Sequence, residues 1–166
     1  MRLSNVIPSK IYQLAQLKNK IASWRVTGHS IAFTNGVFDM LHEGHIFSLS
    51  QAAAEADFLI VAVNSDTSVK KLKGPGRPVN SEQTRALILA SLIMVDAVII
   101  FEEDTPLHII TEILPDIIVK GGDYIPEQIA GAKEVLANGG RVVINPLIGG
   151  VSTTALIEKL SNRHVK

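Results

Sequence analysis

The chain of 166 residues contains no cysteine, and this absence excludes disulfide bonds and thiolate metal sites. It also lacks an excess of charge of either sign, because 16 lysine and arginine residues balance 16 aspartate and glutamate residues. A balanced charge provides no overall field to recruit nucleic acid or an anionic membrane surface. We therefore expect neither nucleic acid nor a membrane among the partners.

Long hydrophobic runs are missing as well. Polar residues interrupt every apolar stretch well before the ~20 residues that a membrane-spanning helix needs. Residues 1–5 are too polar for the apolar core of a secretory signal. These features predict a cytoplasmic, globular protein with enough residues to bury a hydrophobic core.

Short apolar runs alternate with segments of helical periodicity along most of the chain. Continuous apolar runs are typical of strands that are covered on both faces of a sheet. The expected strands are 30–33, 58–63, 96–101, 116–120 and 141–144. The expected helices are 8–24, 46–56, 81–94, 105–114 and 126–138, with a last one from about 152.

This alternation predicts an α/β fold with right-handed crossovers. We expect a doubly wound, five-stranded parallel sheet in the order 3-2-1-4-5. The first and fourth strands are then neighbours where the winding reverses, and ligands bind there, outside the carboxyl ends of the strands. The expected site therefore comprises the loops 42–45 and 120–123. Residues 1–28 form a separate helical segment, either an accessory layer or a subunit contact, and residues 29–166 form the main domain.

Two histidines, His42 and His45, lie where the first strand passes into a helix. Unpaired N–H groups and the positive end of the helix dipole attract anions at such a position. Gly36 lets the chain turn, and Gly44 leaves no side chain between the histidines, so that a phosphate can approach the backbone. Because the two histidines share one face of a helical turn, the spacing favours a phosphate site over two solvated side chains.

Residues 36–45, GVFDMLHEGH, resemble the signature of the nucleotidyltransferase (cytidylyltransferase-like) superfamily. Residues 77–80 with Arg85, 101–106, 119–124 and 152–154 resemble the D-glycero-β-D-manno-heptose 1-phosphate adenylyltransferase family. That activity is the nucleotidyltransferase half of bifunctional ADP-heptose synthase. The resemblance implies a Rossmann-like fold and transfer of AMP from ATP to a sugar 1-phosphate, giving ADP-heptose and pyrophosphate for lipopolysaccharide core or related glycans.

In such a reaction, an oxygen of the sugar 1-phosphate attacks the α-phosphorus of ATP. A phosphate monoester has a second pKa of about 6, so its oxygen is ionised near neutral pH and needs no strong general base. Catalysis then depends on in-line positioning and on neutralising charge. The sequence offers many hydrogen-bond donors but no Ser-His-Asp triad and no metal-ligand cluster. We expect Mg²⁺ to arrive bound to the triphosphate, because it gives up water reluctantly.

The resemblance also implies roles for individual residues. His42 and His45 donate to the triphosphate and stabilise the transition state, and Lys73 and Arg85 join them as catalytic cations. An uncompensated Arg85 on an apolar helix would be costly, so its partner is an anionic substrate or an internal carboxylate. The residues expected to bind nucleotide are Asn35, Gly36, Phe38, Gly44, Lys120, Gly121, Asp123, Ser152, Thr153 and Thr154.

On the substrate side we expect Asp39, Lys71 and Arg77, with Asp39 capping its loop rather than performing chemistry. Glycines and a proline follow Lys71, so residues 70–78 are predicted to form a loop whose cations close over the substrate. A homodimer is also expected, from the family pattern and from apolar faces near Trp24.

Two other readings stay open. One is a related enzyme with another acceptor, such as glycerol 3-phosphate cytidylyltransferase or phosphopantetheine adenylyltransferase; Arg77-Pro78 and residues 120–123 favour the heptose reading. The other is a nucleotide-binding module without turnover, against which the intact histidine pair argues. A redox dinucleotide fold is excluded because no Gly-x-Gly-x-x-Gly follows the first strand.

Overall fold

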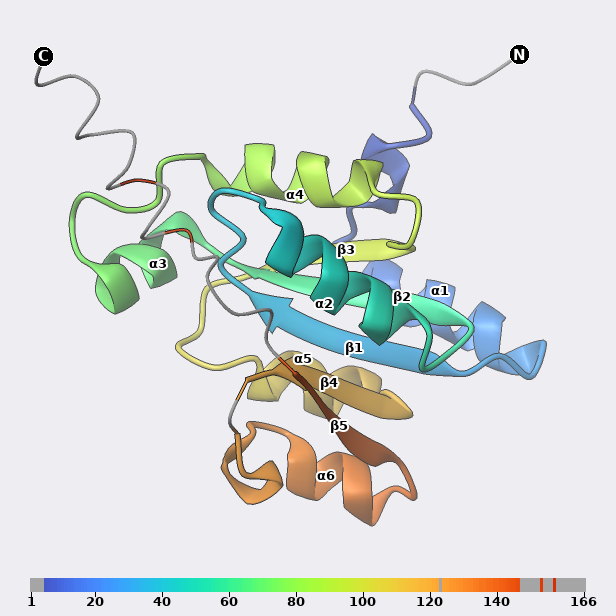
Figure 1. Ribbon diagram of the computed structural model, residues 1–166. Coiled ribbons are helices and arrows are strands. Elements are labelled where there is room, and N and C mark those ends of the chain that lie inside the picture. The colour runs from blue at the N-terminus through green and yellow to red at the C-terminus, as the bar shows by residue number, and fades with distance from the viewer. Residues whose placement is uncertain (1–4, 123, 147–152, 154–156, 158–166) are drawn as a thin grey trace, which may run out of the picture.

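The computed structural model describes residues 5–122, 124–146, 153 and 157 (Figure 1). Its centre is a parallel sheet of β1 (Ile31–Gly36), β2 (Phe58–Asn64), β3 (Ala97–Phe101), β4 (Ile117–Gly121) and β5 (Arg141–Asn145). The strand order is β3-β2-β1-β4-β5, which confirms the predicted order 3-2-1-4-5. The first and fourth strands are therefore neighbours, as the predicted position of the site requires.

Helices cover both faces of this sheet (Figure 1). On one face α2 (Glu43–Ala53) and α4 (Glu82–Ser91) pack against alternate strand residues. On the other face lie α1 (Leu14–Val26), α5 (Leu107–Ile113) and α6 (Ala132–Ala137). The remaining helical elements are η1 (Pro8–Lys10), α3 (Asp66–Lys73) and η2 (Pro126–Gln128).

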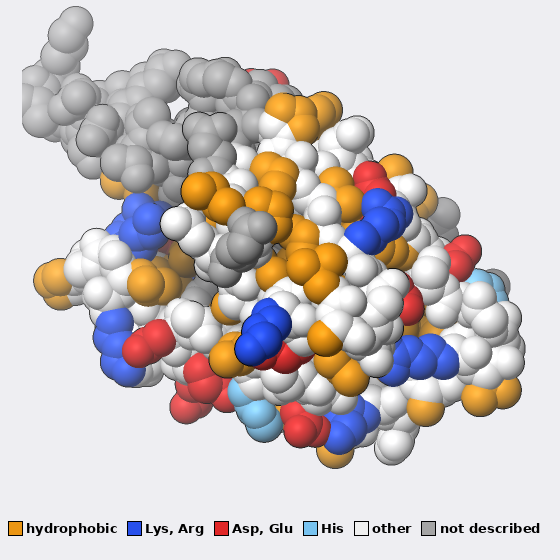
Figure 2. Space-filling model, turned by 90° about the horizontal axis from the view of Figure 1, so that it is seen from below, with side chains coloured by type: hydrophobic (Ala, Val, Ile, Leu, Met, Phe, Trp, Pro, Cys, Tyr) orange, Lys and Arg blue, Asp and Glu red, His pale blue; other side chains and the backbone are white. Residues whose placement is uncertain are grey.

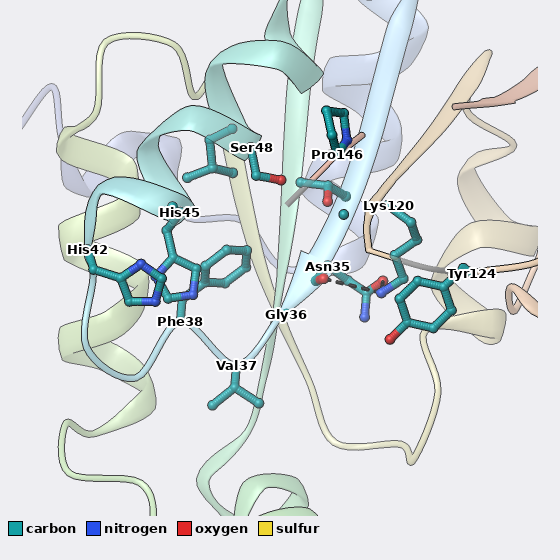
Figure 3. Close-up of a pocket in the computed structure, with 14 residues that line it drawn as sticks. Asn35, Gly36, Val37, Phe38, His42, His45, Ser48, Lys120, Tyr124 and Pro146 are labelled. Carbon is teal, nitrogen blue, oxygen red and sulfur yellow. Dashed lines mark hydrogen bonds between the residues drawn. The ribbon is translucent and has the colours of Figure 1, made fainter. Parts of the chain in front are cut away.

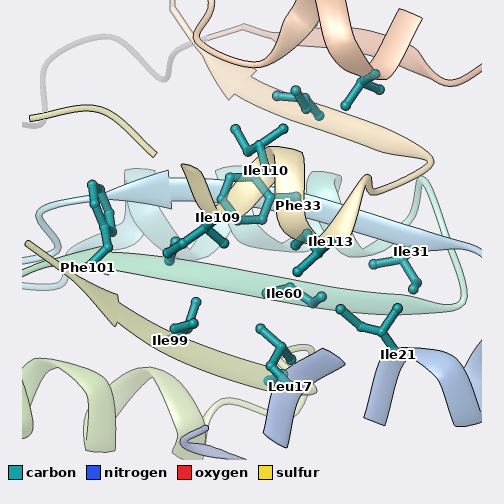
Figure 4. Packing of buried hydrophobic residues seen from close by; sticks show 14 of the residues in the cluster. Leu17, Ile21, Ile31, Phe33, Ile60, Ile99, Phe101, Ile109, Ile110 and Ile113 are labelled. Atoms are coloured by element: carbon teal, nitrogen blue, oxygen red, sulfur yellow. The ribbon is translucent and has the colours of Figure 1, made fainter. Parts of the chain in front are cut away.

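The N-terminal helix forms a layer on the sheet. Its residues Leu17 and Ile21 pack into the core beneath the strands (Figure 4). Trp24 is only 6% exposed and stacks on Phe58, with ring centroids 4.2 Å apart. The indole is therefore part of the core, and the Trp24 side chain itself does not provide the exposed apolar face expected for a dimer.

The predicted helix 8–24 is interrupted. After η1, Ile11 forms a parallel bridge with Val98 of the edge strand β3. The amide of Tyr12 then donates to the carbonyl oxygen of Val98 over 2.9 Å. The edge of a sheet carries backbone groups that lack hydrogen-bond partners, and here residues 11 and 12 pair with that edge before α1 begins.

Two other predicted segments also differ. The helix expected at 126–138 is divided into η2 and α6, because Gly131 takes a left-handed φ of +81° between them. Residues 70–73, expected in a loop, form the C-terminal half of α3. The hydroxyl of Ser65 caps that helix by accepting from the amide of Ser68 over 3.1 Å.

None of the helices in the described part of the chain is both long enough and apolar enough to cross a membrane. On the face seen in Figure 2, the basic and acidic side chains of the described residues are intermixed.

Candidate active site

A cavity of about 320 Å³ opens where β1 and β4 end. Many of the predicted site residues line it: Asn35, Gly36, Phe38, His42, Gly44, His45, Lys120 and Gly121. The two histidines lie on one side, while Asn35, Lys120 and Tyr124 lie on the other (Figure 3). Segments 75 residues or more apart in sequence thus meet at the predicted point of the sheet.

The imidazoles of His42 and His45 lie against each other, with ring centroids 3.9 Å apart. The Nδ1 atoms of both are buried and have no hydrogen-bond partner among the described residues. Burial, aided by the neighbouring His42, lowers the pKa of His45 to about 4. His45 is therefore neutral near pH 7, and a neutral imidazole still donates one hydrogen bond.

Gly44 leaves room for an imidazole. A Cβ atom at this position would lie 3.1 Å from Cε1 and Nδ1 of His42. The expected reason for this glycine was approach of a phosphate to the backbone; the structure adds that the ring of His42 occupies the space where a side chain would be.

The turn after β1 depends on Phe38, which has a left-handed φ of +49°. Its ring lies 3.1 Å from where a Cβ of Gly36 would be and 5.4 Å, between centroids, from the imidazole of His45. Gly36 itself has no positive φ. The glycine therefore makes room for the phenyl ring that packs beside His45, and the unusual backbone falls on Phe38.

Lys120 faces the histidines across the cavity. Its Nζ donates to Oδ1 of Asn35 over 2.8 Å and lies 5.7 Å from the centroid of the Tyr124 ring. Burial lowers the pKa of Lys120 to about 8. Within residues 5–122 and 124–146 no carboxylate forms an ion pair with it. A half-buried cation of this kind is suited to an anionic ligand.

Asp39 ties two loops together. Its carboxylate is fully buried and accepts from Nε of Arg77 over 2.6 Å and from the amides of Val79 and Asn80 over 2.8 and 3.0 Å. Burial opposes ionisation, but these hydrogen bonds hold the pKa of Asp39 below its ordinary value. Asp39 thus acts as a clasp between the two loops, and its carboxylate neutralises the charge of Arg77.

Arg85 is 1% exposed and finds its partners within the protein. It donates through Nη2 to Oδ1 of Asp66 and through Nη1 to the carbonyl oxygen of Val37, both over 2.7 Å. Nε donates to the carbonyl oxygen of Asn80 over 3.1 Å. The internal carboxylate that the sequence left open is therefore Asp66. Because Arg85 does not line the cavity, we interpret it as a positioning residue and not as a catalytic one.

The lysines of α3 do not line the cavity. Lys71 is exposed, and its Nζ lies 3.7 Å from Oδ1 of Asp104. Lys73 is also exposed, at the end of the helix. The helical conformation of residues 70–73 places both at the surface, and of the loop predicted at 70–78 only residues 74–78 lie outside the helix.

Four more residues were expected to bind the nucleotide: Asp123, Ser152, Thr153 and Thr154. Only Thr153 belongs to the described residues, and the other three lie outside them. Oγ1 of Thr153 donates to the carbonyl oxygen of Met40 over 3.3 Å. Thr153 therefore lies beside the loop that leads to the histidines, as a role in the site requires.

Sequence reasoning gave no site role to six lining residues: Thr34, Val37, Ser48, Leu49, Tyr124 and Pro146. Ser48 follows His45 by three positions in α2, and this helical spacing was a usable signal. Tyr124 lies in a stretch that carried the family resemblance without being given a role. Nothing in the sequence around Pro146 pointed to the site. Among the described residues, no group of three His, Asp or Glu side chains is arranged to hold a metal ion.

The model of the family described as cytidylyltransferase-like matches residues 33–159, a range that contains both histidines and Lys120. The chain belongs to the cytidylyltransferase-like family. It is 55% identical over 140 residues to the bifunctional protein HldE of Hyphomonas neptunium, covering 84% of this chain and 29% of that protein. It is also 55% identical over 146 residues to HldE of Haemophilus influenzae, covering 88% and 31%. The chain thus spans less than a third of the curated relatives it matches.

Solved structures agree with this family fold. A lipopolysaccharide core biosynthesis protein from Thermoplasma volcanium superposes with a TM-score of 0.59 at 28% identity, covering 75% of this chain and all of that one. A pantoate-β-alanine ligase from Francisella tularensis superposes with a TM-score of 0.58, covering 92% of this chain and 76% of that one. At 17% identity, the second likeness concerns the fold alone.

Proposed function

We propose that this cytidylyltransferase-like chain is an adenylyltransferase that joins AMP from ATP to D-glycero-β-D-manno-heptose 1-phosphate. The products are pyrophosphate and ADP-heptose, a precursor of lipopolysaccharide core or a related glycan. The 55% sequence identity to HldE, in alignments that cover more than four fifths of this chain, supports this assignment. Those relatives are bifunctional and much longer, so the chain would supply one of two activities.

One observation carries the proposal: an imidazole pair, whose buried Nδ1 atoms have no hydrogen-bond partner in the described part of the chain, faces a half-buried ammonium across one cavity. An α-phosphorus between them would lie near Gly36, with donors on either side. His42 and His45, at the N-terminus of α2, would stabilise charge on the leaving pyrophosphate. Lys120 would neutralise charge on the incoming phosphate.

The proposed reaction forms one bond and breaks one bond at the α-phosphorus, and it needs no general base. An oxygen of the sugar phosphate forms a bond to the α-phosphorus while the bond from that phosphorus to the β-phosphate oxygen breaks. Because the attacking oxygen is already ionised, the residues of the cavity only orient the groups and offset their charge. Mg²⁺ would enter on the triphosphate and neutralise part of its charge. The cavity lining offers nitrogen donors for the triphosphate itself.

The test is pyrophosphate release by the purified chain, with ATP, CTP, GTP and UTP each offered with three acceptors. We expect release with ATP and heptose 1-phosphate, and little with glycerol 3-phosphate or phosphopantetheine. Release only with CTP and glycerol 3-phosphate would replace this function by the cytidylyltransferase reading. Binding of ATP without release of pyrophosphate would identify a module without turnover.

The variant His45→Ala should lower turnover at least ~100-fold, as expected for loss of a donor that stabilises transition-state charge. His108→Ala is the matched control, because His108 is exposed on α5 and lies outside the cavity. Equal turnover in the two variants would remove His45 from the catalytic residues.

A further inference from the structure

A second cavity adjoins the candidate active site. It has a volume of about 190 Å³ and shares Asn35, Lys120 and Tyr124 with the first. These three residues therefore form a wall between the two cavities, and the Lys120 ammonium lies in that wall. A ligand that spans the wall would present its anionic group to Lys120 and the rest of its structure to the second cavity.

The direction from which the nucleophile must approach the α-phosphorus indicates which substrate would bind in the second cavity. In-line displacement requires the nucleophile to approach the α-phosphorus from the side opposite the leaving group. The proposed leaving pyrophosphate lies toward His42 and His45. Figure 3 shows Lys120 and Tyr124 on the other side of Gly36 from that pair. The acceptor phosphate therefore approaches past Lys120, and the second cavity lies on its path.

The lining of the second cavity suits a polyhydroxylated molecule. Pro106 and Ile129 are buried and provide an apolar floor. Asp104, Thr105 and Gln128 are exposed and provide a carboxylate, a hydroxyl and an amide at the rim. Small-molecule sites combine apolar surface with a few placed polar groups in this way. The Tyr124 ring adds a flat surface for the C–H face of a sugar.

We propose that this second cavity is the acceptor subsite, which holds the ring of a sugar 1-phosphate while Lys120 binds its phosphate. Thr105 and Gln128 hydrogen-bond the ring hydroxyls, and Asp104 accepts from a further one. The inference rests on the proposed function and adds the location of the acceptor. The nucleoside then occupies the part of the first cavity lined by Ser48 and Pro146.

The experiment compares Thr105→Val and Gln128→Ala with two matched controls. Thr111→Val makes the same change on α5, where the hydroxyl of Thr111 donates to the carbonyl oxygen of His108. Gln83→Ala makes the same change on α4, away from both cavities. The substrates are ATP and D-glycero-β-D-manno-heptose 1-phosphate, and circular dichroism verifies that each variant is folded.

Each rim variant should raise the KM for the sugar 1-phosphate about three- to tenfold, the effect of losing one neutral hydrogen bond. The KM for ATP should stay the same, and both controls should behave as the unaltered chain. A raised KM for ATP with an unchanged acceptor KM would assign the cavity to the nucleoside and overturn the inference. Unchanged KM values for both substrates would overturn it as well.

The two proposals fail in different ways. An unaltered chain that releases no pyrophosphate with any acceptor would refute the proposed function and this inference together. An active chain whose rim variants leave the acceptor KM unchanged would refute the inference alone.

Discussion

Nη1 of Arg85 donates to the carbonyl oxygen of Val37 over 2.7 Å, across 48 positions of sequence. Val37 precedes Phe38, the residue with the left-handed backbone whose ring packs beside His45. A buried guanidinium thus holds in place the turn that supports a proposed catalytic imidazole. The second partner of Arg85, Asp66, balances the charge that makes this bond strong.

Removal of the Arg85 side chain should therefore be costly. Arg85→Ala should lower the free energy of unfolding by about 3–5 kcal/mol, because it leaves the Asp66 carboxylate and two carbonyl groups without their buried partner. Urea unfolding followed by circular dichroism measures this change. The control is Arg141→Ala, whose exposed ion pair with Glu55 should contribute less than about 1 kcal/mol. Similar losses in both variants would contradict the role given to Arg85.

The Asp39 clasp predicts a dependence of stability on pH. Because the pKa of Asp39 is lower in the folded chain than its ordinary value, the unfolded chain takes up a proton first as the pH falls. The stability that Asp39 contributes is thus complete above its unfolded pKa of about 3.9 and is lost as the pH falls through the folded pKa. Asp39→Asn should be less stable at pH 7 and should lose less stability between pH 5 and pH 3. Unfolding curves of both proteins across that range test this, and parallel losses would refute it.

Lys120 predicts an alkaline limit of activity. With a pKa lowered by burial to about 8, its ammonium loses the proton as the pH rises past that value. The kcat/KM for the acceptor reports the free enzyme and should fall above about pH 8. Lys120→Arg should be slower at pH 7, because a guanidinium has a different shape, but its profile should stay flat to pH 10. An unchanged alkaline limb in that variant would assign the limb to another group.

His45 predicts a loss of stability in mild acid. The pKa of His45 is about 4 in the folded chain, below the ordinary 6.5. Between pH 6.5 and pH 4 this histidine is therefore protonated in the unfolded chain but neutral in the folded chain. The free energy of unfolding should therefore decrease as the pH falls from 6.5 to 4. His45→Gln should reduce this slope, whereas His108→Gln, on an exposed part of α5, should leave it unchanged. Equal slopes in all three proteins would contradict the burial of a neutral imidazole.

Gly131 predicts a steric penalty next to the second cavity. At its φ of +81° an added Cβ would lie 2.4 Å from Cγ2 of Ile110. Gly139 has a similar φ of +85°, but no atom of the described residues lies within 4 Å of a Cβ added there. Gly139→Ala should therefore cost about 1 kcal/mol for backbone strain, and Gly131→Ala about 2–4 kcal/mol for strain and overpacking. Thermal unfolding of both variants measures the difference, which should disappear if Ile110 is free to move aside.

The sequence by itself determined the strand order and the position of the site. Alternating apolar runs and helical periodicity are local patterns, and they record which faces of each element are buried. Right-handed crossovers then leave few ways to connect five parallel strands. His42, His45 and Lys120 follow strands that this order makes neighbours, so their meeting in one cavity could be predicted from sequence alone.

Only the tertiary structure decided which polar groups pair. Asp39 meets Arg77 across 38 positions, and Lys120 meets Asn35 across 85. Of the two partners that the sequence left open for Arg85, a substrate anion or an internal carboxylate, the structure has the second, Asp66, and adds the carbonyl of Val37. Ile11 leaves its predicted helix for the edge of β3. The periodicity of apolar residues within a segment indicates which of its faces is buried, and each segment contains that information on its own. The partner of a charge depends on which loops the folded sheet brings together, and no single segment contains that information.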